Sequence, residues 1–292
     1  LKVYKIPETG RQSKGKPIIN LIDLKPDEKI AAFVPVREFD NEHFIVAATE
    51  QGVINKQPLS AYSNIRRDGI NAINLDDGDR LIECKLTSGS NDIILGTSSG
   101  QAVRFHESAV RELGRNTRGV KGITLRNDDK VVSMIIIINE DDQVLTVTRN
   151  GYGKKTPVAD YRKTNRGGSG IINIKVTEKN GAVIALKDVI SGSFDLMLVT
   201  RNGIIIRVDV NKISTIGRNT QGVKLISLDD DDEVIDITLC ERDAEESEQK
   251  TEEIPEAIPE AIEAADAQES FNVTDEEQEI QTKDEEPEEP NE

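Results

Sequence analysis

Hydrophobic positions along this chain fall in short runs that are rich in Val and Ile and are bounded by Gly, Asn and Asp. Asn-Gly pairs, as at 150–151 and 202–203, are typical of tight β-hairpins, because a type I′ turn needs positive φ at both central residues. The pattern predicts an almost entirely β body, with brief helical turns in stretches such as 108–113. The apolar runs cover residues 30–34, 44–48, 92–95, 131–138, 182–186, 204–208 and 234–239.

The pattern itself repeats. In four segments an apolar run leads into a polar turn that ends at Gly52, Gly100, Gly151 or Gly203, and these glycines are 48, 51 and 52 residues apart. A period in this range indicates an array of similar supersecondary units. Each unit has room for about four strands, which favours a blade of a propeller-like fold. We expect repeats at about 1–38, 39–90, 91–141, 142–193 and 194–241.

A loop rich in Gly and in basic residues recurs with the same period and confirms it. There are five such loops but four turn glycines, and the first residue is Leu1. We therefore expect four full blades, one partial blade, and a fragment of a longer protein that lacks the first strands of its first unit. The loops cover residues 10–16, 65–69, 114–121, 162–170 and 217–224.

Charge divides the chain into two parts. Of its 37 basic and 54 acidic residues, 3 and 22 lie from Glu241 onward, so the net charge of −17 hides a nearly neutral body. The last part is rich in Glu, Pro and Ala and poor in aromatic residues. Such a segment buries too little apolar surface to offset the entropy of ordering. We expect a β domain over 1–241 and a disordered acidic tail over 242–292.

Residues for independent catalysis are not gathered in any recognisable motif. The chain has no phosphate-binding P-loop, no H-E-x-x-H and no G-x-S-x-G. Cys84 and Cys240 are far apart, and His43 and His106 belong to different repeats. The longest apolar run, 134–138, is too short to span a membrane. These observations argue against a self-contained enzyme, and they predict no catalytic and no metal site.

Basic residues recur at equivalent places and point to a polyanion. A cation follows each turn glycine by four positions, at Lys56, Arg104, Lys155 and Arg207, and others lie in the glycine-rich loops. If blades surround an axis, these charges form a curved basic rim that holds duplex phosphates without reading bases. The scarcity of aromatic side chains argues against single-strand stacking. The predicted DNA-binding residues are Arg11, Lys14, Lys16, Lys56, Arg66, Arg67, Arg104, Arg115, Arg118, Lys121, Lys154, Lys155, Arg162, Lys163, Arg166, Arg207, Arg218 and Lys224.

Several segments spread over residues 1 to about 240 carry a family likeness. They read K-V-Y-K-I-P-E at 2–8, V-R-F-H-E-S at 103–108, N-G-Y-G-K-K-T at 150–156, I-K-V-T-E-K-N-G at 174–181 and I-G-R-N-T-Q-G-V at 216–223. With T-S-G at 87–89 and the acidic tail, they make the chain similar to the C-terminal domain of the bacterial DNA gyrase A protein.

The resemblance implies a six-bladed β-pinwheel that wraps duplex DNA around its rim. It implies an isomerase, an ATP-hydrolysing type II topoisomerase that introduces negative supercoils. The gyrase B protein would be the partner in an A2B2 assembly, and the location would be cytoplasmic and nucleoid-associated. ATP and Mg²⁺ are implied for the holoenzyme, and no cofactor for this segment.

Two features of the family fall outside this sequence. Its catalytic tyrosine belongs to an N-terminal domain, so Tyr4, Tyr62, Tyr152 and Tyr161 are not given that role. Its hallmark box, Q-R-R-G-G-K-G, belongs to the first blade, and residues 10–16 and 166–170 are its degenerate counterparts.

Two alternatives stay open. The equivalent domain of the topoisomerase IV A protein has the same fold but degenerate blades, and the near-regular period together with the matches at 174–181 and 216–223 favours gyrase. A propeller scaffold that binds acidic proteins would also use a basic rim. Salt-dependent binding to random-sequence duplex DNA would distinguish a DNA-wrapping domain from that scaffold.

Overall fold

The computed structural model describes residues 1–10, 12–22, 24–25, 28–66, 69–190, 194–229 and 231–242. The predicted tail therefore lies outside the described residues, except for Arg242. Short 3₁₀ turns are η1 (Val3–Lys5), η2 (Ile18–Asn20), η3 (Leu59–Tyr62), η4 (Glu107–Ala109), η5 (Val158–Asp160) and η6 (Val210–Lys212). The strands are β1 (Phe44–Thr49), β2 (Val53–Pro58), β3 (Leu81–Thr87), β4 (Asp92–Thr97), β5 (Gln101–His106), β6 (Val120–Lys121), β7 (Val131–Ile137), β8 (Gln143–Thr148), β9 (Tyr152–Pro157), β10 (Ile171–Ile172), β11 (Val183–Val189), β12 (Phe194–Thr200), β13 (Ile205–Asp209), β14 (Val223–Lys224) and β15 (Val234–Glu241).

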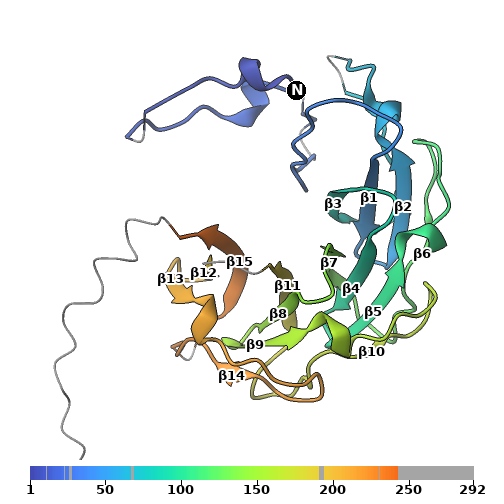
Figure 1. Cartoon of the computed structure of the whole chain (residues 1–292). Coiled ribbons are helices and arrows are strands. Elements are labelled where there is room, and N and C mark those ends of the chain that lie inside the picture. Colours follow the sequence, from blue (N-terminus) through green and yellow to red (C-terminus); the bar gives the residue numbers. More distant parts are fainter. Residues whose placement is uncertain are drawn as a thin grey trace, which may run out of the picture. The chain divides into compact units, whose positions relative to one another are not determined.

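The described strands form a series of antiparallel sheets (Figure 1). Three sheets have four strands, in the orders β3-β1-β2-β6, β10-β5-β4-β7 and β11-β8-β9-β14, and a fourth sheet has the order β13-β12-β15. In every sheet three consecutive long strands of one repeat lie side by side. The predicted all-β array of blade-like sheets is therefore confirmed.

The fourth strand of each four-stranded sheet comes from the following repeat, and we call β6, β10 and β14 the exchanged strands. β6 pairs with β2, β10 with β5, and β14 with β9. The repeat pattern predicted about four strands in each unit but gave no sign that one of them joins the sheet of the preceding unit. In the described chain no exchanged strand covers β13, so Ile205 is 61 % exposed, whereas Ile54 at the equivalent position is fully buried.

The hairpins between the first two strands of each repeat differ from the predicted type I′ turn. The backbone N–H of Gly52 donates to the carbonyl of Thr49 at 3.0 Å, and Gly52 has φ of +81°. The Asn residues before Gly151 and Gly203 do not have positive φ. The turn is thus a tight turn followed by one left-handed residue, the common three-residue hairpin loop, and only the Gly needs positive φ.

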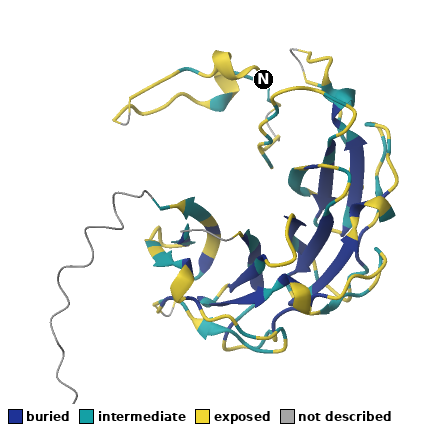
Figure 2. Cartoon of the chain, in the orientation of Figure 1, coloured by how far each residue is buried: buried dark blue, intermediate teal, exposed yellow. Residues whose placement is uncertain are grey.

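Hydrophobic cores lie between neighbouring sheets as well as within them. One core cluster joins Val46 and Ile54 of the first sheet to Ile93 and Phe105 of the second. The inner edge strands β3, β7, β11 and β15 contact one another in turn. Dark blue residues in Figure 2 accordingly concentrate in the long strands, while the connecting loops are exposed. Each blade therefore depends on its neighbours for burial.

Residues before β1 depart from prediction. The apolar run 30–34, expected as a strand, has no strand assignment. A strand needs a neighbour that takes up its backbone hydrogen bonds, and no described strand pairs with this run. The other predicted runs all overlap observed strands, and the helical turn expected at 108–113 is present only at its start, where η4 spans Glu107–Ala109.

Candidate nucleic-acid interface

Three of the four cations that follow the turn glycines point inward. Lys56, Arg104 and Lys155 are 5 %, 3 % and 7 % exposed. Each pairs in strand register with the residue ten positions earlier, and the side chains of Lys56 and Arg104 contact the residue twelve positions earlier. Arg104 donates from Nε and Nη2 to Asp92 Oδ2 at 2.9 and 2.6 Å, and the ammonium of Lys56 lies 4.1 Å from the ring centroid of Phe44. The expectation that these three face an open basic track is wrong.

The far ends of Lys56 and Arg104 reach the 3₁₀ turn of the next repeat. Lys56 Nζ lies 3.2 Å from Glu107 Oε2 in η4. Arg104 Nη1 donates to the carbonyls of Val158 and Tyr161, at 3.0 and 3.3 Å, at either end of η5. A buried cation held on both sides ties one blade to the next, which explains why a basic residue recurs inside a strand.

The fourth of these cations, Arg207, is also ion-paired. Its Nε lies 2.5 Å from Asp195 Oδ2, and Arg242 contacts the other oxygen of the same carboxylate. The side chain of Arg207 is 41 % exposed. Hydrogen bonds from Arg242 and Arg207 hold the pKa of Asp195 below its usual value. Arg207 therefore links the two strands of its own hairpin, as Arg104 does in its repeat, but at a more exposed place.

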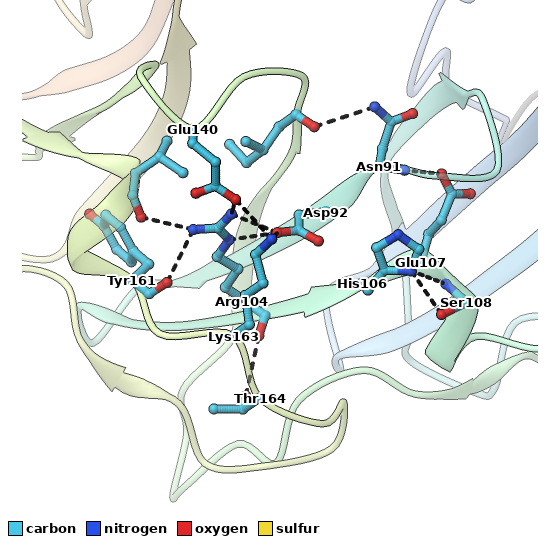
Figure 3. Close-up of polar contacts among 12 residues, drawn as sticks. Asn91, Asp92, Arg104, His106, Glu107, Ser108, Glu140, Tyr161, Lys163 and Thr164 are labelled. Atoms are coloured by element: carbon cyan, nitrogen blue, oxygen red, sulfur yellow. Dashed lines mark hydrogen bonds and ion pairs between the residues drawn. The ribbon is translucent and has the colours of Figure 1, made fainter.

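Figure 3 shows the densest of these clusters, around Arg104. Glu140 Oε1 lies 2.5 Å from Arg104 Nη2 and 2.8 Å from Lys163 Nζ, and Lys163 also lies 3.0 Å from Asp92. Hydrogen bonds from Arg104, then from Lys163, lower the pKa of Glu140 to about 2. Lys163 belongs to a basic loop, but its ammonium is ion-paired with the carboxylates of Asp92 and Glu140.

Lys154 is the most deeply buried of the predicted DNA-binding residues. It is fully buried, and its ammonium donates to the carbonyls of Gly217 and Arg218, both at 2.7 Å, and to Thr220 Oγ1 at 3.2 Å. Burial, followed by the nearby charge of Arg218, lowers the pKa of Lys154 to about 8. The side chain holds the basic loop 217–224 through these bonds, and its charge does not face solvent.

The basic loops lie at the outer edge of the sheets, just before the exchanged strands. We call residues 114–119, 165–170 and 217–222 the outer loops. The carbonyl of the fourth residue in each accepts a backbone hydrogen bond from the preceding repeat: Asn74 donates to Thr117, Thr124 to Gly168 and Lys175 to Thr220, at 3.0, 2.9 and 2.8 Å. The loops and exchanged strands thus form one hydrogen-bonded outer layer.

The predicted cations divide by exposure within and around this layer. Lys121 and Lys224 are exposed on the layer, and Arg162 is exposed just before the outer loop 165–170. Arg118 is exposed but lies 2.8 Å from Asp76. The remaining predicted residues are exposed Lys14, Lys16 and Arg66, half-buried Arg115, Arg166 and Arg218, and Arg11 and Arg67, which lie outside the described residues.

Among the exposed cations that sequence reasoning missed are Arg111, just before an outer loop, and Lys175, just after an exchanged strand. Lys175 lies in the segment after β10, at the repeat position of Thr124, and its backbone takes part in the outer layer. Aligning the repeats on the glycine before each exchanged strand would have found it. Within the described ranges there is no group of His, Cys, Asp and Glu that could hold a metal ion, and no helix is long and apolar enough to cross a membrane.

The strand-exchanged blades and the basic outer layer define a β-propeller-like class of domain. The family model described as "DNA gyrase C-terminal domain, beta-propeller" matches residues 1–37, 43–88, 91–138, 142–189 and 195–241. The chain belongs to this family.

Curated relatives and solved structures agree. The chain is 49 % identical to the DNA gyrase A protein of Staphylococcus aureus strain NCTC 8325 / PS 47 over 248 residues, which are 84 % of this chain and 28 % of that protein. It is similar to the crystal structure of the C-terminal domain of DNA topoisomerase IV, with a TM-score of 0.76, 26 % identity, and coverage of 82 % of this chain and 74 % of the other. A gyrase A C-terminal domain structure has the same fold, with a TM-score of 0.69, 24 % identity, and coverage of 78 % and 75 %. The chain thus spans little more than a quarter of the length of the gyrase A proteins that it matches.

Proposed function

We propose that this chain is the part of a DNA gyrase A protein that binds and wraps duplex DNA along its outer layer. The observation that carries the proposal is the repeated geometry of that layer in a chain of the gyrase family. Lys121 and Lys224 are exposed at the second position of the exchanged strands β6 and β14, and Arg162 is exposed just before the outer loop of the repeat between them. Phosphates recur along a duplex at regular intervals, so regularly spaced cations hold it independently of sequence.

The buried cations do not belong to this surface. Lys56, Arg104 and Lys154 have partners inside the protein or at blade contacts, and Lys155 is buried, so we assign DNA contact to the exposed residues. The exposed candidates are Lys14, Lys16, Arg66, Arg118, Lys121, Arg162 and Lys224, and we leave out exposed Lys163 because its ammonium is paired with both Asp92 and Glu140.

The rest of the assembly is also proposed from the family. A gyrase A protein would act with the gyrase B protein in an A2B2 complex, which hydrolyses ATP with Mg²⁺ and introduces negative supercoils. The chain would then work in the cytoplasm, on the nucleoid. We propose that the strand-cleaving tyrosine is not among the tyrosines of this segment, because the family carries it in its N-terminal domain; Tyr161, for its part, is buried and bonded to Asn173 Oδ1.

The test is a fluorescence-anisotropy titration of the chain with random-sequence duplex DNA at several salt concentrations. The K121Q/R162Q/K224Q variant should flatten the slope of log K against log salt by about 2.7, at about 0.9 for each phosphate contact. K187Q, on the inner strand β11, is the control and should keep the parent slope. A parent that binds an acidic protein but not duplex DNA would replace this function with the scaffold alternative.

A topoisomerase IV component is the second candidate, because the structural match to a topoisomerase IV C-terminal domain has a TM-score of 0.76. The two functions differ in the assembled enzyme. A gyrase holoenzyme that contains this chain should introduce negative supercoils into relaxed plasmid with ATP, whereas a topoisomerase IV holoenzyme would leave that plasmid relaxed.

A further inference from the structure

Two arginines occupy the same place in successive outer loops and make the same unusual contact. Arg166 Nη1 donates to the carbonyl of Lys121 at 3.0 Å, and Arg218 Nη1 donates to the carbonyl of Ile172 at 2.8 Å. Lys121 and Ile172 are the second residues of the exchanged strands β6 and β10. Each arginine therefore bridges from its own outer loop to the exchanged strand of the preceding blade.

Arg166 makes a second such bond. Its Nε donates to the carbonyl of Ala109, in η4, at 2.8 Å. Gly167 also donates to the carbonyl of Gly122, and Thr124 Oγ1 donates back to the carbonyl of Gly167, at 2.6 Å each. The planar guanidinium thus fixes the loop against two carbonyls of the neighbouring repeat. A lysine, with one ammonium on a flexible stem, does not reproduce this fork.

The acceptors of these bonds are backbone carbonyl oxygens, which carry no formal charge. The bonds therefore fix the position of the arginine without pairing its positive charge with a negative one. Its half-buried side chain is directed at the preceding strand, whereas Lys121 and Arg162 on either side of it are exposed. The exposed residues can reach phosphates along the layer, but their spacing depends on the junction between each outer loop and the exchanged strand that precedes it.

We propose that Arg166 and Arg218 are positioning residues, which set the spacing between successive DNA-contacting loops rather than binding phosphates themselves. The proposal rests on the proposed wrapping function. In this arrangement the loss of one arginine releases a loop, so the contacts of several exposed cations are lost together.

Three substitutions separate positioning from direct contact in the full chain. R162Q removes an exposed cation of the same loop region and should lower the salt slope by about 0.9. R166Q should lower the slope by about 2, because the contacts of Lys121 and Arg162 are lost with the loop. R166K keeps the charge but not the fork, and it should behave like R166Q. In the R166Q background, K121Q should add little further loss.

Amide hydrogen exchange gives a readout without DNA. The Thr124 N–H, bonded to the carbonyl of Gly168, should exchange at least tenfold faster in R166Q than in the parent and should be unchanged in R162Q. If R166Q folds poorly, R218Q provides the same test one blade later, with the Lys175 N–H, bonded to Thr220, as the reporter.

The outcomes are distinct. An R166K protein with the parent slope, or an R166Q protein that loses a single unit of slope with unchanged exchange at Thr124, would make Arg166 a direct phosphate contact and overturn the inference. If the Thr124 N–H exchanges faster in R166Q but the parent chain shows no salt-dependent duplex binding, the wrapping function is overturned, and the positioning role for DNA with it.

Discussion

Buried charge is the main lesson at the scale of single residues. A basic residue four places after a turn glycine looks like surface chemistry in the sequence, because Lys and Arg are seldom buried unless paired. The structure shows the pairing partners: Asp92 and Glu140 for Arg104, and Glu107 for Lys56. The period of a strand shows that successive side chains point to opposite faces of the sheet. It does not show which of the two faces the next blade covers. That information is long-range, so the sequence alone did not separate these cations from Lys121 or Lys224.

Arg104 gives the first prediction. The R104M substitution leaves the Asp92 carboxylate, in a residue that is 6 % exposed, without its main partner. We expect the free energy of unfolding to fall by about 3–5 kcal/mol, since breaking one side of a buried pair leaves an uncompensated charge. Urea unfolding measures the loss, and D92N added to R104M should recover part of it. The salt slope for DNA should not change, and a loss of slope without a loss of stability would return Arg104 to the DNA surface.

Lys154 gives a prediction in pH. Its pKa is lowered from 10.5 to about 8 in the folded protein, so between these values the unfolded chain binds more protons. The free energy of unfolding must then rise with pH over this window, relative to a protein without the lysine. The difference between the parent and K154M should grow in favour of the parent from pH 8 to about 10.5 and stay constant below pH 8. Parallel pH profiles of the two proteins in urea titrations would show that Lys154 has an ordinary pKa.

At the scale of elements, the long strands could be predicted and the exchanged strands could not. Runs such as 131–138 carry enough β-branched residues to define a strand, and β7 spans Val131–Ile137. The exchanged strand β6 has two residues, too few for any periodicity, and its partner β2 lies in another repeat. The outer layer, which holds the candidate site, is built from these short elements. Its loops were visible in the sequence as basic and glycine-rich, but their contacts were not.

The hairpin glycines test the revised turn. Both Gly151 and Gly203 have positive φ, at +77° and +85°, which costs a non-Gly residue about 1–2 kcal/mol. A Cβ at Gly151 would also lie 2.6 Å from Ile226 Cγ2 and 3.0 Å from its carbonyl, whereas a Cβ at Gly203 would meet nothing within 4 Å. G151A should therefore destabilise clearly more than G203A in thermal or urea unfolding. Equal losses would mean that the contact with Ile226 is not present.

At the scale of the whole molecule, the cations that recur in the repeats have two roles. Inner ones, such as Arg104, join neighbouring blades, and outer ones, such as Lys121, face solvent on the layer of loops and exchanged strands. Exchange of a strand with the preceding sheet links these two levels, because each outer loop is also the route by which a repeat reaches its neighbour. A surface assembled in this way keeps its cations at a spacing set by the blades.

Wrapping of DNA by that surface is the central claim, and a linking-number measurement tests it most directly. Nicked plasmid is ligated in the presence of increasing amounts of the chain, the protein is removed, and the topoisomers are resolved. Wrapping predicts a shift of the topoisomer distribution that grows with protein, is lost in K121Q/R162Q/K224Q, and is retained in the control K187Q. A distribution that stays at the protein-free position while the duplex is saturated would show that the chain binds DNA without wrapping it, and would contradict this claim.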